Sequence, residues 1–402
     1  MDFEILILGS DANAYYMARC AYEAYQKKAH LIGKDRLAFT KYSNILTIEY
    51  QEKLWDESFF VDLLNDYAKK HPCKILVIST NETYSMFLAK NRKKLQENLI
   101  YPKQDERILE TLTNKENFYK TYKKSGLVFP ETHYFDVLKN TVIPTLKYPI
   151  VLKPANVVEY NHLKFEDKHK IYKLNSEEEV EKTIHQIKDA GYKDRLILQE
   201  FVPGDDSFLF DSVVYVDRKG KCKVISFAQI GLQERSKTMV GNAATLINGL
   251  NTFNGDAESM KKSILAFMEK LGMNGFYEFD MKYDLKEKQF KVLEINARQG
   301  RCSYYLTPLG ANLVETLVKD LIFKEELPFK DLKEKCLLSF VPKRIVKKFI
   351  GNEDFKQEVL KLWKKRVSPM ECKKDRNIKR FLMMKKRLWH YSVEYKNSYW
   401  EE

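Results

Sequence analysis

Residues 292–301 of this 402-residue chain read Val292-Leu293-Glu294-Ile295-Asn296-Ala297-Arg298-Gln299-Gly300-Arg301. The apolar residues predict a β-strand over 292–296, and side chains two residues apart on a strand point to the same face. Glu294 and Asn296 are therefore expected on one face. A preceding strand, predicted over 275–283, carries Asp280, and an antiparallel hairpin would bring Asp280 next to this pair.

Two carboxylates and an amide oxygen are hard ligands of the kind that Mg²⁺ prefers. An acidic face exposed to solvent is the alternative explanation. The surrounding residues are apolar, however, and the burial of unpaired acids costs free energy. The sequence thus predicts a metal site formed by Asp280, Glu294 and Asn296.

Four basic residues are candidates for binding anionic groups. Arg298 and Arg301 follow the predicted metal ligands directly, and planar guanidinium groups suit carboxylates and phosphoryl groups. Lys153 ends an apolar strand and Lys115 begins a helix, and a lysine that faces a cleft can bind a phosphate. Taken alone, each lysine is more simply explained as a solvated side chain.

Strands and helices alternate in the first hundred residues, which predicts a parallel sheet with crossover helices. These strands are expected over 5–8, 30–32, 45–48 and 75–79. The turn after the first strand lacks a Gly-x-Gly-x-x-Gly motif, so a nicotinamide cofactor is not expected. A second segment begins near Asp105 and includes a strand predicted over 222–230.

Five stretches of the chain resemble the ATP-grasp superfamily and, within it, the D-aspartate ligases of peptidoglycan cross-bridge synthesis. They are Leu8-Gly9-Ser10-Asp11 with Asn13 and Ala18-Arg19, Leu152-Lys153-Pro154-Ala155-Asn156 with Glu159-Tyr160, Phe201 to Ser207, Phe279 to Asp284, and Glu294 to Arg301. The resemblance implies an α/β fold with a Rossmann-like pre-ATP-grasp domain over 1–104. It further implies an ATP-grasp domain over 105–330, whose two α+β subdomains clamp ATP (the lid subdomain about 120–198), and a basic, helical C-terminal segment over 331–402.

The same resemblance implies a role for each matching residue. Lys115 and Lys153 would hold the ATP phosphates, and the segment 155–168 would cover them; an ordinary exposed hairpin is the alternative for this segment. Gln199, Glu200 and Val202 would form the hinge that binds adenine, and Asp206 would hold the ribose. Asp280, Glu294 and Asn296 would bind two Mg²⁺ ions, for which Mn²⁺ could substitute. Arg298 would stabilise the transferring phosphoryl group, and Arg301 would hold the donor carboxylate.

The implied reaction forms an amide through an acyl phosphate. The resemblance points to D-aspartate, activated at its side-chain carboxyl, and to the lysine ε-amine of a cytoplasmic UDP-linked muramoyl pentapeptide as acceptor. Two arginines also suit a dicarboxylate, because one binds the reacting group and the other the spectator group. A ligase for another amino acid, a dipeptide or a small metabolite is the alternative.

Six further residues are candidates for binding the substrates: Ser10, Asp11, Asn13, Arg19, Arg235 and Lys237. The loop Gln233-Glu234-Arg235-Ser236-Lys237-Thr238 departs from the family, which has an acidic, proline-bearing loop there. This basic loop leaves the identity of the donor acid open.

The composition is that of a globular protein, with 44% hydrophobic and 31% charged residues and a mean hydropathy of -0.48. No apolar run is long enough to predict a membrane-spanning helix, and acids near Met1 argue against a signal peptide. Six scattered cysteines without a Cys-x-x-Cys motif make zinc and disulfides unexpected and favour the cytoplasm.

Most of the net charge of +13 lies in residues 331–402, which contain 20 Lys and Arg against 10 Asp and Glu. Bases and apolar residues interleave over 343–390, which predicts an amphipathic helical tail. Such a tail would bind the diphosphate of the acceptor or the inner membrane surface, and a solvated basic face is the alternative. The alternative functional class is a protein that only binds a nucleotide, a nucleic acid or a membrane through this tail. Binding alone needs no set of metal ligands, which argues against this class. A nucleic-acid partner is not expected. The sequence does not indicate the oligomeric state.

Overall fold

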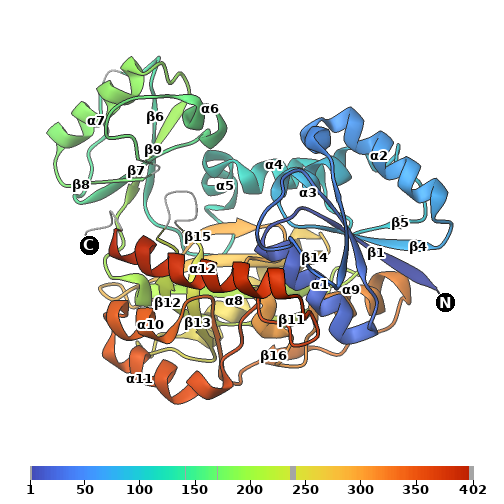
Figure 1. Cartoon of the computed structure of the whole chain (residues 1–402). Helices are drawn as coiled ribbons and strands as arrows, with labels where there is room; N and C mark the ends of the chain where they lie inside the picture. Colours follow the sequence, from blue (N-terminus) through green and yellow to red (C-terminus); the bar gives the residue numbers. More distant parts are fainter. Residues whose placement is uncertain (1, 141, 170, 236–240, 398–402) are drawn as a thin grey trace.

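The computed structural model describes the chain except residues 1, 141, 170, 236–240 and 398–402. The described elements form a parallel N-terminal sheet, a small antiparallel sheet and a large central sheet (Figure 1). This arrangement confirms the predicted α/β class. Among the described helices, none is long and apolar enough to cross a membrane.

The N-terminal sheet contains parallel strands in the order β3-β2-β1-β4-β5, as the alternation of strands and helices predicts. Its elements are β1 (Phe3–Leu8), α1 (Ala12–Tyr25), β2 (Ala29–Gly33), β3 (Leu46–Tyr50), η1 (Glu52–Trp55), α2 (Glu57–Lys70), β4 (Lys74–Ser79), α3 (Glu82–Lys90) and β5 (Leu99–Ile100). Residues 5–8 are buried on both faces of the sheet, which a parallel sheet covered by helices requires. Helix α1 begins soon after β1 because the Asp11 side chain accepts a hydrogen bond from the Ala14 amide and caps the helix.

Two helices, α4 (Glu106–Thr113) and α5 (Lys115–Tyr122), lead from this domain to a lid subdomain that stands apart at the upper edge of the molecule in Figure 1. The lid sheet is antiparallel, in the order β6-β9-β7-β8. Its elements are β6 (Thr132–Asp136), β7 (Ile150–Pro154), α6 (Val157–His162), β8 (Tyr172–Leu174), α7 (Glu177–Asp189) and β9 (Arg195–Glu200). The segment 155–168, expected to cover the triphosphate, contains the short helix α6.

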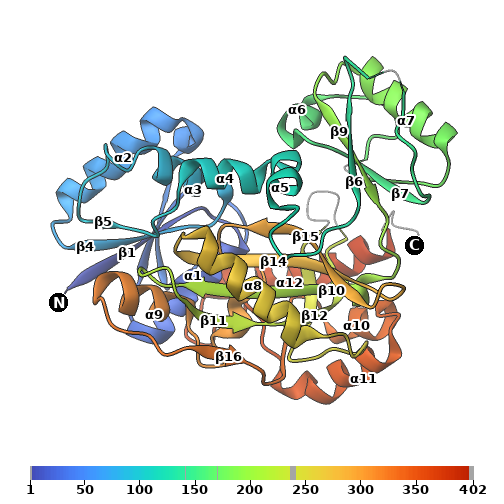
Figure 2. The same cartoon turned by 180° about the vertical axis from the view of Figure 1, so that it is seen from behind.

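The central sheet has the strand order β15-β14-β10-β12-β13-β17, with β11 and β16 at its side. Helix α8 covers one face of this sheet (Figure 2). The elements are η2 (Asp206–Phe208), β10 (Leu209–Val216), β11 (Cys222–Ser226), β12 (Ala228–Gln233), β13 (Ala243–Asn248), α8 (Ala257–Leu271), β14 (Gly275–Asp284), β15 (Gln289–Asn296), η3 (Ser303–Leu306), α9 (Leu313–Leu317), η4 (Val318–Ile322), β16 (Lys330–Leu332) and β17 (Cys336–Ser339).

The single strand predicted over 222–230 is wrong, because the structure contains two strands there. Strand β11 ends at Ser226 and β12 begins at Ala228. Both strands pair with β10, but β11 continues the sheet to β16 whereas β12 continues it to β13. The strand is therefore interrupted at Phe227, and the segments before and after this residue pair with different neighbouring strands.

The C-terminal segment begins within the central sheet. The boundary predicted between residues 330 and 331 falls inside β16, and β17 extends the sheet from β13. The helices follow: α10 (Lys343–Phe349), α11 (Glu353–Leu362), the turn η5 (Trp363–Lys365) and α12 (Ile378–Lys396). The segment is thus joined to the catalytic fold by strand pairing, and the domain limits stay a prediction.

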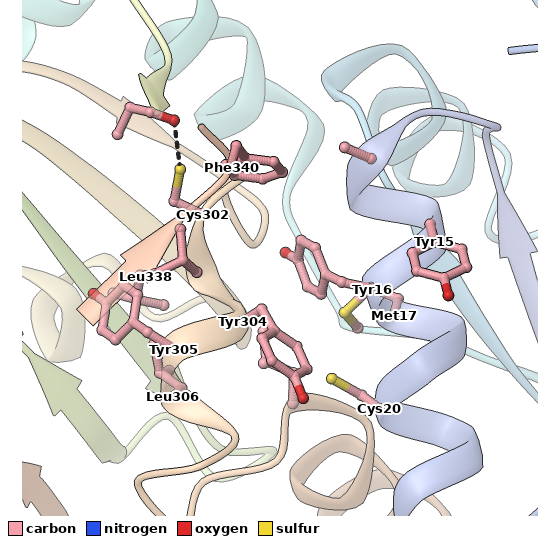
Figure 3. Packing of buried hydrophobic residues seen from close by; sticks show 14 of the residues in the cluster. Tyr15, Tyr16, Met17, Cys20, Cys302, Tyr304, Tyr305, Leu306, Leu338 and Phe340 are labelled. Carbon is pink, nitrogen blue, oxygen red and sulfur yellow. Dashed lines mark hydrogen bonds between the residues drawn. The ribbon is translucent and has the colours of Figure 1, made fainter. Parts of the chain in front are cut away.

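A shared core joins the N-terminal domain to the central sheet. Figure 3 shows Tyr16, Met17 and Cys20 of α1 facing the segment after β15. The rings of Tyr16 and Tyr304 lie 6.2 Å apart between centroids, and Cys302 donates a hydrogen bond of 2.9 Å from Sγ to the Ala243 carbonyl oxygen. These contacts fix the chain immediately after the predicted metal ligands.

Candidate functional site

The β14–β15 hairpin brings the predicted metal ligands together. It is antiparallel, and its register pairs Asp280 with Glu294 and Glu278 with Asn296. The Asn296 side-chain amide donates a hydrogen bond of 3.1 Å to Asp280 Oδ2. The structure thus contains the predicted hairpin and places these three side chains on one face of it, while their role as metal ligands stays a prediction.

Two more carboxylates, which the sequence analysis did not select, lie at the same place. Asp211 on β10 pairs across the sheet with Asp280, and Glu278 precedes Asp280 by two residues on β14. Carboxylate oxygens of Asp211, Glu278 and Asp280 all lie within 4.8 Å of one another. The same alternation that selected Asn296 could have found Glu278, whereas Asp211 follows only from the register of β10.

The carboxylates of this cluster repel one another. Burial raises the pKa of Asp211 to about 7. Burial also raises the pKa values of Glu278 and Asp280, and the negative charges of neighbouring carboxylates raise them further. Glu294 differs: the charge of Lys115 lowers its pKa to about 2. A buried set of oxygen ligands with excess negative charge fits a divalent cation such as Mg²⁺.

The structure brings the two predicted phosphate-binding lysines to this site. Asn114 caps α5 and places Lys115 in its first turn, where Lys115 Nζ lies 3.0 Å from Glu294 Oε2. Lys153 is buried at the end of β7 and donates a hydrogen bond of 2.8 Å from Nζ to Gln199 Oε1. The charge of Lys153 also contributes to the low pKa of Glu294. The two ammonium groups therefore act on the same carboxylate.

The predicted adenine hinge connects the lid to the central sheet. Gln199 and Glu200 end β9, and Val202 is buried just beyond it. Glu200 Oε1 lies 2.8 Å from Nζ of Lys291, a lysine of β15 that is 2% exposed in its side chain. Sequence reasoning missed Lys291, because its partners come from β9 and from the hairpin turn.

Asp206, predicted to hold the ribose, is fixed by the end of β12. Its carboxylate accepts hydrogen bonds of 2.8 and 2.7 Å from the Gln233 amide and side chain, and Arg235 Nη2 lies 2.9 Å from its Oδ2. Arg235 thus binds Asp206 and does not line the cavity beside the metal ligands. Lys237, the other candidate of this loop, lies outside the described residues.

A cavity of about 270 Å³, called the central cavity below, opens beside the carboxylates. Its described lining is Glu82, Asp211, Gly241, Asn242, Ala243, Glu278, Asp280, Glu294, Asn296, Arg298, Arg301 and Cys302. Arg298 Nε lies 2.8 Å from Glu82 Oε1 of α3, and its Nη1 lies 3.7 Å from Glu278 Oε2. The N-terminal domain thus helps to aim Arg298 at the metal ligands.

Arg301 lines the central cavity but already has an anionic partner. Its Nη1 lies 2.6 Å from Oε1 of Glu234, a fully buried carboxylate at the end of β12. Tyr391 of α12 donates a hydrogen bond of 2.9 Å to the same oxygen. A donor carboxylate at Arg301 would therefore share the guanidinium with Glu234.

The N-terminal substrate candidates separate into two groups. Asp11 and Asn13 lie near the loop after β15. Asn13 donates a hydrogen bond of 2.9 Å to the Gln299 carbonyl oxygen. Burial raises the pKa of Asp11, and the positive charges of Arg298 and Arg301 offset this increase only in part. Ser10 and Arg19 have structural partners. Ser10 donates to the Asp35 carbonyl oxygen at 2.6 Å, and Arg19 pairs with Glu23 at 2.7 Å.

Comparison with known proteins identifies one relative by sequence and several by fold. No family model matches the chain. It is 32% identical to a D-aspartate ligase of Enterococcus faecium (strain Aus0004), over 98% of this chain and 96% of that protein. N5-carboxyaminoimidazole synthetase from Staphylococcus aureus, solved with ADP, has a TM-score of 0.63 at 15% identity and covers 90% of this chain and 87% of that one. L-amino acid ligase from Bacillus licheniformis has a TM-score of 0.56 at 17% identity and covers 76% of this chain and 69% of that one. Both structures have the ATP-grasp fold.

Proposed function

The chain belongs to the D-aspartate ligase family and is therefore an ATP-dependent carbon–nitrogen ligase with the ATP-grasp fold, and we propose that it joins D-aspartate to an amine of a peptidoglycan precursor. The reacting group would be the side-chain carboxyl of D-aspartate. The acceptor would be the lysine ε-amine of a UDP-linked muramoyl pentapeptide, which assigns the reaction to the cytoplasm. One observation carries the proposal: the carboxylates and Arg298 line the central cavity, and Lys115 pairs with the lining carboxylate of Glu294.

In this proposal, ATP would extend from the hinge to the central cavity. The backbone of Glu200 and Val202 would bind adenine, and Asp206 would bind the ribose. Lys115 and Lys153 would hold the phosphates, since Lys115 Nζ lies 3.0 Å from Glu294 Oε2 and Lys153 Nζ lies 2.8 Å from Gln199 Oε1, two oxygens that a phosphate could join or replace.

The carboxylate cluster fits Mg²⁺. Asp280, Glu294 and Asn296 would hold two ions, and Glu278 and Asp211 lie close enough to take part. When bound, Mg²⁺ would neutralise the phosphate charges and align the γ-phosphoryl group for transfer.

The chemistry would proceed in two steps. A carboxylate oxygen of the donor attacks the γ-phosphorus of ATP, which forms an acyl phosphate and releases ADP. The neutral amine of the acceptor then attacks the acyl carbon, and phosphate leaves. Arg298 would stabilise the negative charge on the transferring group, because its guanidinium lines the cavity and keeps a fixed orientation between Glu82 and Glu278.

The choice of a dicarboxylate rests on the family and on the two arginines of the central cavity. Arg298 would face the reacting carboxyl, and Arg301 would take the spectator carboxylate on the side away from Glu234. The proposal does not rely on Arg235, whose Nη2 lies 2.9 Å from Asp206 Oδ2.

The test is release of ADP by the purified chain with a UDP-linked lysine-containing muramoyl pentapeptide and one donor at a time. D-aspartate should support faster ADP release and amide formation than L-aspartate, glycine or D-alanine. Faster reaction with glycine or D-alanine would reject the dicarboxylate donor and leave the ligase class intact. Steady-state ADP release that is equally fast without the amine would reject the proposed acceptor chemistry, because the acyl phosphate must be consumed by the amine before the next turnover.

A further inference from the structure

The C-terminal helix α12 carries large apolar side chains on its exposed side. Ile378, Phe381, Leu382 and Trp389 are 80%, 59%, 62% and 60% exposed. Their spacing of three, four and seven residues places them on one side of the helix, which we call the outer face. Lys385 and Lys386 are exposed on the same side.

The opposite side of α12 is fixed to the enzyme. Arg380 is buried, with Nε 3.1 Å from Asp375 Oδ2, and it donates a hydrogen bond of 2.6 Å to the Phe39 carbonyl oxygen. At the other end, Tyr391 and Tyr395 are buried, and Tyr395 donates a hydrogen bond of 2.5 Å to the Gln233 carbonyl oxygen. Because both ends are anchored, the helix cannot rotate to bury its outer face.

A loop of the N-terminal domain enlarges this surface. Tyr42 and Leu37 are each 40% exposed, and the Lys379 ammonium lies 5.8 Å from the centre of the Tyr42 ring. The Asn44 amide binds Asp375 Oδ1 at 2.6 Å, which holds the loop beside the start of α12. Figure 1 shows α12 in front of the remaining elements, next to the N-terminal domain. Two segments distant in sequence thus contribute to one apolar and basic surface.

The outer face of α12 carries positive charge along its length. Glu394 is the single acid in the sequence of α12. It lies on the inner side, 11% exposed in its side chain, with Oε1 2.9 Å from Arg387 Nη1. The outer face therefore presents lysines that no acid of the helix neutralises, within a C-terminal segment of strongly positive charge.

We infer that the outer face of α12 and the Tyr42 loop dock on an anionic lipid surface. Aromatic rings and aliphatic side chains would enter the headgroup region, and Lys379, Lys385 and Lys386 would bind acidic headgroups. A nucleic acid would use the lysines but would leave Ile378 and Leu382 exposed, whereas a lipid surface covers both kinds of side chain. The inference is separate from the proposed reaction, because its test measures lipid binding and not turnover.

The test is co-sedimentation of the full chain with vesicles of phosphatidylcholine, prepared with and without phosphatidylglycerol. The chain should bind the anionic vesicles, and high salt should weaken the binding. Lys385→Gln with Lys386→Gln should reduce the affinity about tenfold or more, since each base near an anionic surface contributes. Phe381→Ser with Trp389→Ser should reduce it by a similar factor through the loss of apolar contact.

Two control pairs separate the outer face from general charge and hydrophobicity. Lys262→Gln with Lys270→Gln removes the same charge from exposed positions on α8, which covers the other side of the central sheet (Figure 2). Leu138→Ser with Leu285→Ser removes exposed apolar side chains elsewhere. Both pairs should bind vesicles like the unchanged chain.

Three results would overturn the inference. The first is equal binding to neutral and anionic vesicles, or to neither. The second is an equal loss of binding in the control pairs and the outer-face variants. The third is a dimer, seen by sedimentation velocity without lipid, that Phe381→Ser with Trp389→Ser dissociates, because a second copy of the chain would then cover this face.

Discussion

Gly300 packs directly against Glu278: a Cβ at position 300 would stand 1.4 Å from Glu278 Oε1. The loop after β15 therefore passes over a carboxylate of the candidate metal cluster, with no room for a side chain. Tyr16 and Asn13 of the N-terminal domain hold this loop by hydrogen bonds of 2.5 and 2.9 Å to its carbonyl oxygens. The position of Glu278 thus depends on the fit between the two domains.

Gly300→Ala should reduce turnover about a hundredfold or more. The added methyl group must displace either the Glu278 carboxylate or the loop that carries Arg298, and small displacements of catalytic groups are costly. ADP release under saturating ATP and Mg²⁺ measures the effect.

Gly310→Ala is the matched control. A Cβ there meets no atom within 4 Å, although the backbone has φ of +85°. The variant should lose about 1 kcal/mol of stability from backbone strain and keep its turnover. A normal rate in Gly300→Ala would show that Glu278 does not contribute to the reaction.

Asp280→Asn and Glu294→Gln should each abolish ATP turnover while the fold is retained. Each change removes a negative charge from the proposed Mg²⁺ site and leaves the side-chain volume nearly unchanged. The rate should fall by orders of magnitude, and the residual rate should need more Mg²⁺. Circular dichroism verifies the fold, and Glu269→Gln, an exposed acid on α8, serves as the control. Near-normal ADP release by either variant rejects the metal assignment.

The alternation of side chains along a strand predicts the site residues that lie on the β14–β15 hairpin. Glu294, Asn296 and Asp280 were found because their strands are strongly apolar and adjacent in sequence. Asp211 could not be found in this way, since its place beside Asp280 depends on the register of β10. The sheet orders and the break at Phe227 likewise depend on which strands become neighbours.

Charged residues with distant partners were the hardest to interpret from sequence. Arg235 is a predicted substrate-binding residue, and the sequence does not reveal its pairing with Asp206. Arg301 lies at the cavity, but its partners Glu234 and Tyr391 lie directly after β12 and on α12. No local pattern reveals contacts among three segments that lie so far apart in the sequence.

Lys291→Met should destabilise the chain at neutral pH by about 3 kcal/mol, because it leaves buried negative charge without a cationic partner. Lys291 Nζ lies 2.8, 2.9 and 3.1 Å from carboxylate oxygens of Glu200, Asp284 and Glu287. The KM for ATP should also rise, since Glu200 belongs to the proposed adenine hinge. Denaturant unfolding and initial rates measure the two effects, and Lys286→Met, on the exposed hairpin turn, is the control.

The stability difference for Lys291→Met should also depend on pH. Burial alone would raise the pKa of Asp284, but its hydrogen bond to Lys291 lowers it overall below the usual 3.8. A carboxyl whose pKa is lowered by folding stabilises the native state above its unfolded pKa and loses that contribution as the pH falls through its folded pKa. The difference between the two chains should therefore be largest near neutral pH and shrink below about pH 4. A constant difference across this range contradicts the charge explanation.

Tyr391→Phe and Tyr395→Phe should affect different substrates, although both tyrosines lie on α12. The Tyr391 hydroxyl binds Glu234, the partner of Arg301, whereas the Tyr395 hydroxyl binds the carbonyl of Gln233, whose amide holds Asp206. Tyr395→Phe removes one hydrogen bond, and Tyr391→Phe removes the bond to Glu234 and a longer one of 3.4 Å that the Tyr391 hydroxyl accepts from Arg301 Nη2. A lost hydrogen bond costs about 1 kcal/mol, which corresponds to roughly fivefold in affinity. We expect Tyr391→Phe to raise the KM of the donor amino acid and Tyr395→Phe to raise the KM of ATP, each with little change in the other constant. Equal effects of the two variants on both constants would mean that α12 only stabilises the fold, whereas the expected split would show that it positions the two binding sites separately.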